Sequence, residues 1–259
     1  NTPVQLPLLC TACFAAMHAT AQRDLPELNT NPGTLSLVEF QRLFEASKRW
    51  GEFGDDDQLG SLNLITPQTR VQAASLVESG ISVSLANPLS KTIEGNFIEP
   101  IGHTTFVFDL PPGFDGGESA AGDVFNINYH GGIHSHMDGV AHFGWRGKLY
   151  NGFDFEPGKD GFANVGVEHI AQHGIFGRGV LVDLPRLYQI NHLPPGTVIE
   201  AEHLEAWERH TGTTIGSGDI LLLRVGRWQI AKDDPDYDAL EATAGIHASF
   251  GPWLKARGV

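Results

Sequence analysis

Residues 129–143 read Y-H-G-G-I-H-S-H-M-D-G-V-A-H-F and hold the densest group of potential metal ligands in the chain. The group consists of His130, His134, His136, Asp138 and His142. The chain has only 12 histidines in 259 residues, so this clustering indicates a function rather than drift in composition. In an extended segment alternate side chains share a face, and His134, His136 and Asp138 would then point the same way. Two imidazoles and a carboxylate suit zinc, manganese or ferrous iron, and we therefore predict a divalent metal site here.

Composition limits the kind of protein that carries this stretch. The chain has 259 residues, of which 41% are hydrophobic, enough for one large domain or two small ones. Its 17 basic residues are outnumbered by 31 acidic ones, which gives a formal net charge of −14 at pH 7. A charge of this sign disfavours binding to nucleic acid and to anionic membrane surfaces. We therefore expect neither nucleic acid nor a membrane as a partner, while the charge says little about a small-molecule substrate, the partner that the metal site favours.

The N-terminal region differs from the rest of the chain. Residues 6–21 form an apolar run that ends in Ala19-Thr20-Ala21. This run resembles the core and cleavage site of a secretory signal, and it is too short to span a membrane. No positive charge precedes it and the chain begins with Asn1, so an ordinary extension is the alternative. We expect residues 1–34 to be a signal remnant plus linker, or such an extension, and 35–259 to be the folded domain. A signal implies a periplasmic or secreted protein, and its absence implies a cytoplasmic one.

Local signals predict helices and strands in mixed order. Ser36 and Glu39 form a capping-box pattern that begins a helix running to about Lys48. Thr66-Pro67 is a cap followed by a first-turn proline, and the helix that it begins is expected to end at Gly80. Further helices are expected at 167–173 and 201–210, and strands at 81–85, 104–110, 124–129, 179–184 and 220–225. Because the two kinds of element are interspersed, the predicted class is α/β or α+β.

Four sequence blocks in combination resemble one enzyme family. They are Trp50-Gly51 through Asp57-Gln58-Leu59-Gly60-Ser61-Leu62-Asn63, then His136-Met137-Asp138-Gly139-Val140-Ala141-His142-Phe143, then Arg178-Gly179-Val180-Leu181-Val182-Asp183, and Gly218-Asp219-Ile220-Leu221-Leu222-Leu223-Arg224. From about residue 40 to the end, the chain resembles the so-called cyclase family of metal-dependent hydrolases, which includes bacterial kynurenine formamidase and isatin hydrolase. The resemblance implies the family's swivelling β/β/α fold in a single domain and a homo-oligomer. It also implies a domain that is incomplete at its C-terminus, because family members continue beyond the equivalent of Val259.

The resemblance also implies roles within the histidine stretch. The family motif His-x-Gly-Thr-His-x-Asp-x-Pro-x-His places two metal ligands on His136 and Asp138, and the general acid/base on His142. Its first histidine, a further ligand, falls on a glycine when the alignment has no gap. Either His134 supplies this ligand from the same strand face, or a two-residue insertion makes His130 the ligand. The alternation of side chains favours His134, and His130 stays as the alternative.

These residue types can together perform hydrolysis. A zinc or manganese ion lowers the pKa of its bound water and polarises a carbonyl, and an imidazole with its ordinary pKa of about 6.5 can take and return a proton at neutral pH. The sequence therefore predicts a metal-dependent hydrolase of a small cyclic or aryl amide, lactam or ester. The alternative is a non-catalytic metal-binding or oligomer-forming relative, favoured by the glycine at the first ligand position. The residues expected to bind substrate are Trp50, Trp145, Tyr150 and His247.

Overall fold

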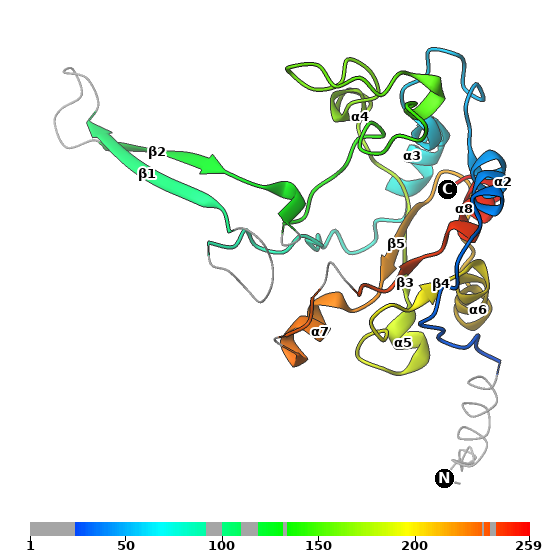
Figure 1. The fold of residues 1–259 in the computed structure, drawn as a ribbon. Helices are drawn as coiled ribbons and strands as arrows, with labels where there is room; N and C mark the ends of the chain where they lie inside the picture. Colours follow the sequence, from blue (N-terminus) through cyan, green and yellow to red (C-terminus); the bar gives the residue numbers. More distant parts are fainter. Residues whose placement is uncertain (1–23, 92–99, 110–118, 132–133, 235, 239–241) are drawn as a thin grey trace, which may run out of the picture.

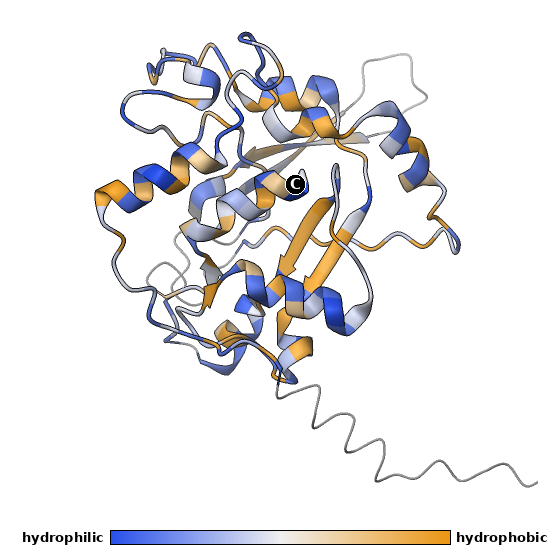
Figure 2. Ribbon diagram, turned by 90° about the vertical axis from the view of Figure 1, so that its right-hand side faces the viewer, coloured by the Kyte–Doolittle hydropathy of each residue, from blue (hydrophilic) through white to orange (hydrophobic). Residues whose placement is uncertain are grey.

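The body of the protein is built around two parallel strands, β3 (Gly179–Asp183) and β5 (Ile220–Arg224). They belong to a computed structural model that describes residues 24–91, 100–109, 119–131, 134–234, 236–238 and 242–259. Both strands are hydrophobic along most of their length (Figure 2), and Val180 and Val182 of β3 are buried. Their bounds lie within one residue of the predicted strands at 179–184 and 220–225, which confirms both predictions.

The crossover between these strands encloses the main core. It runs through α5 (Leu184–Tyr188), β4 (Val198–Ile199) and α6 (Ala201–Thr211), because parallel strands cannot be joined by a tight turn. The helix predicted at 201–210 is thereby confirmed as α6. A second parallel pair joins β4 to β6 (Gly245–Ile246). The fully buried side chains of the core are Val182, Leu184, Leu193, Ile199, Leu204, Ile215 and Phe250.

Two helices from opposite ends of the described chain pack together beside this core (Figure 1). They are α2 (Leu37–Ser47) and α8 (Gly251–Arg257). The predicted capping box is confirmed, since the Glu39 N–H donates to Ser36 Oγ at 3.2 Å and the Ser36 N–H donates to Glu39 Oε2 at 2.9 Å. Lys255 Nζ donates to the Lys48 carbonyl at 2.6 Å and so joins the ends of the two helices.

The second predicted helix is shorter than expected. This helix, α3 (Pro67–Ala74), begins at Thr66, whose side chain accepts the Thr69 N–H as the cap pattern predicts. It ends at Ala74, and the predicted end at Gly80 is wrong. Val71 is 71% exposed, so the apolar side of the helix has little packing to stabilise further turns.

The strand predicted at 81–85 is not formed. Ile81, Val83 and Leu85 alternate as predicted, but they are exposed and no described strand pairs with their backbone. A strand needs a neighbour to satisfy its N–H and C=O groups, and alternation alone does not supply one.

A two-stranded arm projects from the body (Figure 1). Its strands, β1 (Gly102–Asp109) and β2 (Ser119–Asn126), pair antiparallel from Gly102 opposite Asn126 to Asp109 opposite Ser119. The prediction at 104–110 is confirmed within the described residues. The prediction at 124–129 is wrong in its bounds, because β2 begins at Ser119 and ends at Asn126. The small residues 120–122 have weak strand propensity, and pairing with β1 overrides it.

The remaining elements complete a mixed α/β domain, as predicted. The helix expected at 167–173 is α4 (Val167–His173), whereas α7 (Arg227–Asp233) and the short turns of 3-10 helix were not predicted. Leu25 and Leu28, in the segment expected to be a linker, pack against the main core. The possible signal at 6–21 lies outside the described residues. No helix in the described ranges is long and apolar enough to cross a membrane.

Candidate metal centre

The candidate centre lies on the loop that follows the arm. After β2, the 3-10 turn η2 (Tyr129–Gly131) places His130. The side-chain oxygen of Asn128 accepts the His130 N–H at 3.1 Å, a local turn that orients the backbone here. Further along, the His142 N–H donates to the Gly139 carbonyl at 3.0 Å and turns the chain back. These two turns thus bring His130 and His142 to the same side of the loop.

Two close contacts hold this loop against the body. The Ala141 N–H donates to the Val165 carbonyl at 3.0 Å, and both side chains are buried in a small apolar cluster. Gly139 lies directly against the start of α4, where a β-carbon at position 139 would be 2.8 Å from the Val167 nitrogen. Real β-carbons do not approach backbone atoms this closely, so only glycine fits at position 139.

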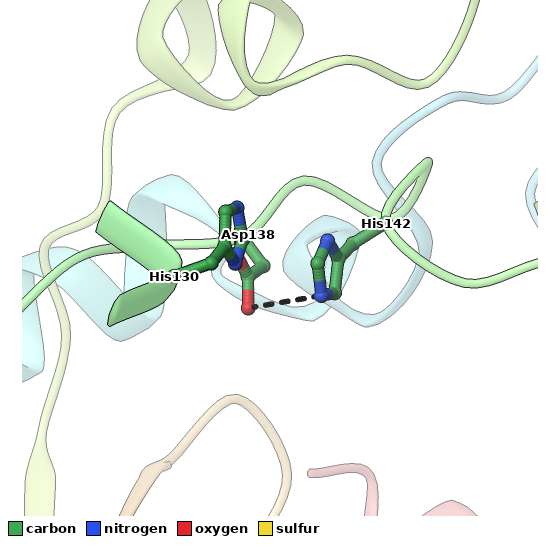
Figure 3. Close-up of side chains that lie close together, drawn as sticks. All are labelled: His130, Asp138 and His142. Carbon is green, nitrogen blue, oxygen red and sulfur yellow. Dashed lines mark ion pairs between the residues drawn. The ribbon is translucent and has the colours of Figure 1, made fainter. Parts of the chain in front are cut away.

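Three side chains of the loop face one another (Figure 3). The potential ligand atoms of His130, Asp138 and His142 all lie within 4.8 Å of one another, so this group could hold a metal ion. The distance from His130 Nε2 to Asp138 Oδ1 is 4.0 Å, and that from His142 Nε2 to Asp138 Oδ2 is 3.9 Å. The two imidazole rings are parallel, with centroids 4.7 Å apart. Solvent reaches all three side chains, which leaves room for an ion and a substrate.

His136 adds a fourth donor whose orientation is fixed. Its Nδ1 lies 3.0 Å from the His134 carbonyl oxygen, which can only accept, so Nδ1 carries the proton. In the neutral ring Nε2 is then a lone pair, and it lies 3.4 Å from Asp138 Oδ1, a second acceptor. Both atoms can serve as ligands to one shared cation. A histidine that binds a metal through one ring nitrogen usually donates the N–H of the other ring nitrogen to a backbone carbonyl or a carboxylate.

The ring of His134 is not part of this group. It is 5% exposed, and neither ring nitrogen has a hydrogen-bond partner among the described residues. Its carbonyl, rather than its imidazole, serves the centre by orienting His136. The structure therefore assembles His130, His136, Asp138 and His142 and places the His134 ring in the interior. A bend at residue 134 interrupts the extended backbone on which the alternation argument depended.

Asp138 also borders a cavity of about 660 Å³. Trp50 and Tyr150, two residues expected to bind substrate, line its wall. Most of the lining is apolar and includes Phe44, Leu62, Ile65, Met137, Val140, Ile170, Ile175 and Leu254. A large, mostly apolar cavity with a small number of polar groups is the usual form of a small-molecule site.

Two other residues expected to bind substrate lie elsewhere. Trp145 packs against Phe40 of α2, with ring centroids 4.9 Å apart, and does not line the cavity. His247 caps the 3-10 turn η4 (Ala248–Phe250), where its Nδ1 accepts the Ser249 N–H at 3.3 Å. The same nitrogen is 3.8 Å from a carboxylate oxygen of Glu200. Through these contacts His247 packs within the body of the protein, and it does not line the cavity.

Comparison with known proteins identifies the family. The family model "Cyclase", described as "Putative cyclase", matches residues 69–259, which include the whole candidate centre. The chain belongs to the cyclase family. The crystal structure of a novel cyclase matches this cyclase-family chain with a TM-score of 0.68 and 28% identity, over 83% of this chain and 73% of the other. Among curated proteins, none gives a significant match.

A carboxylate that the sequence reasoning did not single out supports the cavity wall of this cyclase-family chain. Asp57 accepts hydrogen bonds from Tyr150 Oη at 2.7 Å, Asn63 Nδ2 at 2.7 Å and the Gly60 N–H at 2.9 Å. Gly60 begins the 3-10 turn η1 (Gly60–Leu64), and Tyr150 begins η3 (Tyr150–Gly152). Asp57 therefore joins two loops that are far apart in the sequence. The only sequence signal was its spacing to the glycine and asparagine of the same D-Q-L-G-S-L-N block.

These contacts shift two pKa values. Burial alone would raise the pKa of Asp57, but the hydrogen bonds from Asn63, Tyr150 and the Gly60 N–H outweigh it and lower the pKa below its usual range. Burial and the hydrogen bond to Asp57 raise the pKa of Tyr150 above its usual range. Asp57 is therefore ionised and Tyr150 protonated over the whole neutral pH range.

Replacing Asp57 with asparagine is expected to lower the free energy of unfolding by about 1–3 kcal/mol at pH 7, because hydrogen bonds to a charged acceptor are lost. A carboxylate with a lowered folded pKa stabilises fully above its unfolded pKa of about 3.9, and this stabilisation is lost as the pH falls through the folded value. Urea denaturation of both proteins between pH 7 and 3 should therefore show the difference shrinking below about pH 4. The exposed neighbour Asp56, changed to asparagine, is the control and should behave like wild type. A difference that persists unchanged at pH 3 would contradict this account.

Proposed function

We propose that this cyclase-family chain is a metal-dependent hydrolase of a small cyclic or aryl amide, lactam or ester. The observation that carries the proposal is the grouping of the imidazoles of His130, His136 and His142 around Asp138, at 3.4–4.0 Å from its carboxylate oxygens. A divalent cation matches this set of imidazole and carboxylate donors. Family membership supports enzymatic activity, and the donor set supports metal-assisted hydrolysis.

We assign His130, His136 and Asp138 as the residues that hold the ion. His130 Nε2 and His136 Nε2 lie 4.0 and 3.4 Å from Asp138 Oδ1, and two imidazoles with one carboxylate suit zinc or manganese. This assignment prefers His130 to His134 because the His134 ring is buried and its carbonyl is already used by His136. When bound, the cation lowers the pKa of a water and polarises the substrate carbonyl, which makes hydrolysis possible at neutral pH.

His142 is assigned as the general acid and base. Its Nε2 is 3.9 Å from Asp138 Oδ2, close enough to exchange a proton with a group seated beside the carboxylate. Its side chain is 35% exposed, so the proton can also reach bulk water. The imidazole would accept a proton from the attacking water and deliver it to the leaving nitrogen or oxygen. Its edge-on contact with Phe143 and its stack on His130 hold the ring in place.

The cavity beside Asp138 accounts for the proposed substrate class. Its apolar lining favours a flat hydrocarbon or aromatic portion, while the scissile carbonyl would lie at the Asp138 side. Trp50 offers an aromatic face, and Tyr150, held protonated beside Asp57, offers a hydroxyl group. A cyclic or aryl amide, lactam or ester has this combination of a flat apolar part and one carbonyl.

Turnover after removal and return of metal tests the proposal. Purified protein treated with a chelator is expected to lose hydrolysis of a panel of formanilides, lactams and aryl esters. Zn(II) or Mn(II) should restore it, whereas Ca(II), which prefers all-oxygen sites, should not. Activity that is indifferent to chelation would overturn the metal dependence. Tight, stoichiometric metal binding with no turnover of any panel member would instead identify a non-catalytic metal-binding protein.

A further inference from the structure

The turn that carries Asp138 and His142 is hydrogen-bonded to the body of the protein through Val165. The Ala141 N–H donates to the Val165 carbonyl at 3.0 Å. Within residues 136–143, as the structure describes them, this is the one backbone hydrogen bond to a segment outside the histidine stretch. Ala141 lies between Asp138 and His142 in the sequence, so the placement of both side chains depends on the direction of the Val165 carbonyl.

The backbone conformation of Val165 is unfavourable for its own side chain. Its φ is 55°, which lies in the left-handed region. The β-carbon of an L-residue is crowded in this region, and a branched β-carbon is crowded further, so a valine here is an outlier. Such a conformation persists only where the surrounding contacts outweigh its cost, and it occurs most often at functional sites.

Three contacts hold Val165 in this conformation. Its side chain is fully buried in the apolar cluster with Ala141 and Leu149. Its carbonyl accepts the hydrogen bond from Ala141, and its N–H donates to Oε1 of Gln58 at 2.7 Å. Gln58 and Val165 are 107 positions apart, so this last contact ties together two distant parts of the chain.

Gln58 follows directly after the residue that supports the cavity wall. Asp57 accepts the hydrogen bond from Tyr150 Oη, and Tyr150 lines the cavity. Gln58 itself does not line the cavity. Two consecutive side chains therefore reach two parts of the site: Asp57 holds the aromatic wall, and Gln58 holds the residue to which the turn with Asp138 is hydrogen-bonded.

We propose that Gln58 is a positioning residue, which holds the metal-binding turn in place through Val165 without touching metal or substrate. Together with Asp57 it sets the spacing between the metal centre and the cavity wall. Hydrogen-bonded residues behind the ligands of a metal commonly orient those ligands in this way. The proposal rests on the proposed function, since it takes the group around Asp138 to be the metal centre.

Loss of the Gln58 acceptor would change the turn in two steps. The Val165 N–H would be left buried without a partner, which costs free energy. The left-handed conformation would then lose one of the contacts that outweigh its cost, and a rotation of φ towards the ordinary region would turn the Val165 carbonyl away from Ala141. The side chains of Asp138 and His142 would no longer be held in their common geometry.

Metal titration of Gln58 variants tests the proposal. Gln58→Leu removes the acceptor and keeps most of the volume, and it is expected to weaken binding of Zn(II) or Mn(II) by about 10- to 100-fold. Gln58→Glu keeps an oxygen at the same position and should retain an affinity near that of wild type. Thr197→Val controls for general destabilisation, because it removes a hydrogen bond of a buried side chain in the body and should lower only the melting temperature.

Backbone hydrogen exchange of the metal-free protein gives a readout that needs neither metal nor turnover. The amides of residues 138–142 should exchange faster in Gln58→Leu than in wild type, and at the wild-type rate in Gln58→Glu and Thr197→Val. If Gln58→Leu does not fold, Gln58→Asn takes its place, because its side chain is shorter by one methylene and withdraws the same acceptor.

Two results would overturn the role of Gln58. One is wild-type metal affinity in a folded variant that lacks the acceptor, and the other is exchange of residues 138–142 that is no faster than in Thr197→Val. A wild-type protein that binds no metal would instead contradict the proposed function. The exchange measurement would still decide whether Gln58 holds the turn.

Discussion

Replacing Asp138 with asparagine is expected to weaken binding of Zn(II) or Mn(II) by at least about 100-fold, and to lower turnover by roughly 1,000-fold or more. Asparagine keeps the shape of the side chain but removes the negative charge that the surrounding imidazoles approach at 3.4–4.0 Å. Calorimetric titration with metal and turnover on the same preparation measure both effects. Asp123→Asn is a matched control, because it removes a carboxylate 2.6 Å from a histidine outside the centre and should leave metal affinity unchanged.

The same titration separates the two candidates for the third ligand. His130→Ala should weaken metal binding strongly, whereas His134→Ala should chiefly lower the melting temperature, because its ring is buried. The reverse order would favour His134 as ligand and require a different loop conformation. Full metal occupancy in Asp138→Asn would show that the group around Asp138 does not bind the metal.

Replacing His142 with alanine is expected to lower the turnover number by roughly 100- to 10,000-fold while metal content stays near that of wild type. The physical reason is that His142 moves a proton, while His130, His136 and Asp138 still hold the ion. His142→Asn should do no better, because an amide can form hydrogen bonds but cannot exchange a proton near neutral pH. Metal content, melting temperature and turnover are to be measured on one preparation of each variant.

His169→Ala provides the comparison for this experiment, because it removes an imidazole of α4 that does not belong to the group of His130, Asp138 and His142. Its turnover should match wild type. Loss of metal from His142→Ala would make His142 a ligand instead of a proton carrier, and unchanged turnover with a lowered melting temperature would leave it only a packing role.

Features that depend on a few neighbouring residues could be predicted from the sequence. The caps at Ser36 and Thr66 formed as expected, because each uses a side chain and an N–H three residues away. The apolar strands β3 and β5 were also predictable, because short continuous apolar runs such as V-L-V and I-L-L-L are typical of strands in parallel sheets. The bounds of β3 and β5 were therefore predicted closely, whereas their parallel pairing was not predicted.

Features that depend on distant packing could not be predicted. Helix α3 ends early and segment 81–85 stays unpaired because no described element packs against their apolar side chains. The local sequence pattern does not show whether such a neighbour exists. Likewise, β2 extends to Ser119 because β1 pairs with it along its whole length. The weak propensity of residues 120–122 gave no sign of this.

The candidate centre falls between these cases. The residue types within 130–142 indicated a metal site, and four of the five potential donors meet in space. Which four they are depends on the backbone: a bend at His134 turns its ring inward, while the turn after Gly139 returns the chain so that His142 stacks on His130. The alternation of side chains along a strand predicts neither the bend at His134 nor the turn after Gly139.

The contact at Gly139 fixes more than the identity of one residue. The atoms that a β-carbon would meet at 2.8–3.3 Å are backbone atoms of residues 165–167, and these cannot swing aside as the tip of a side chain can. Any side chain larger than hydrogen at position 139 would therefore have to push the start of α4 away from the loop that carries Asp138. The spacing between this helix and the candidate ligands thus depends on a single missing methyl group.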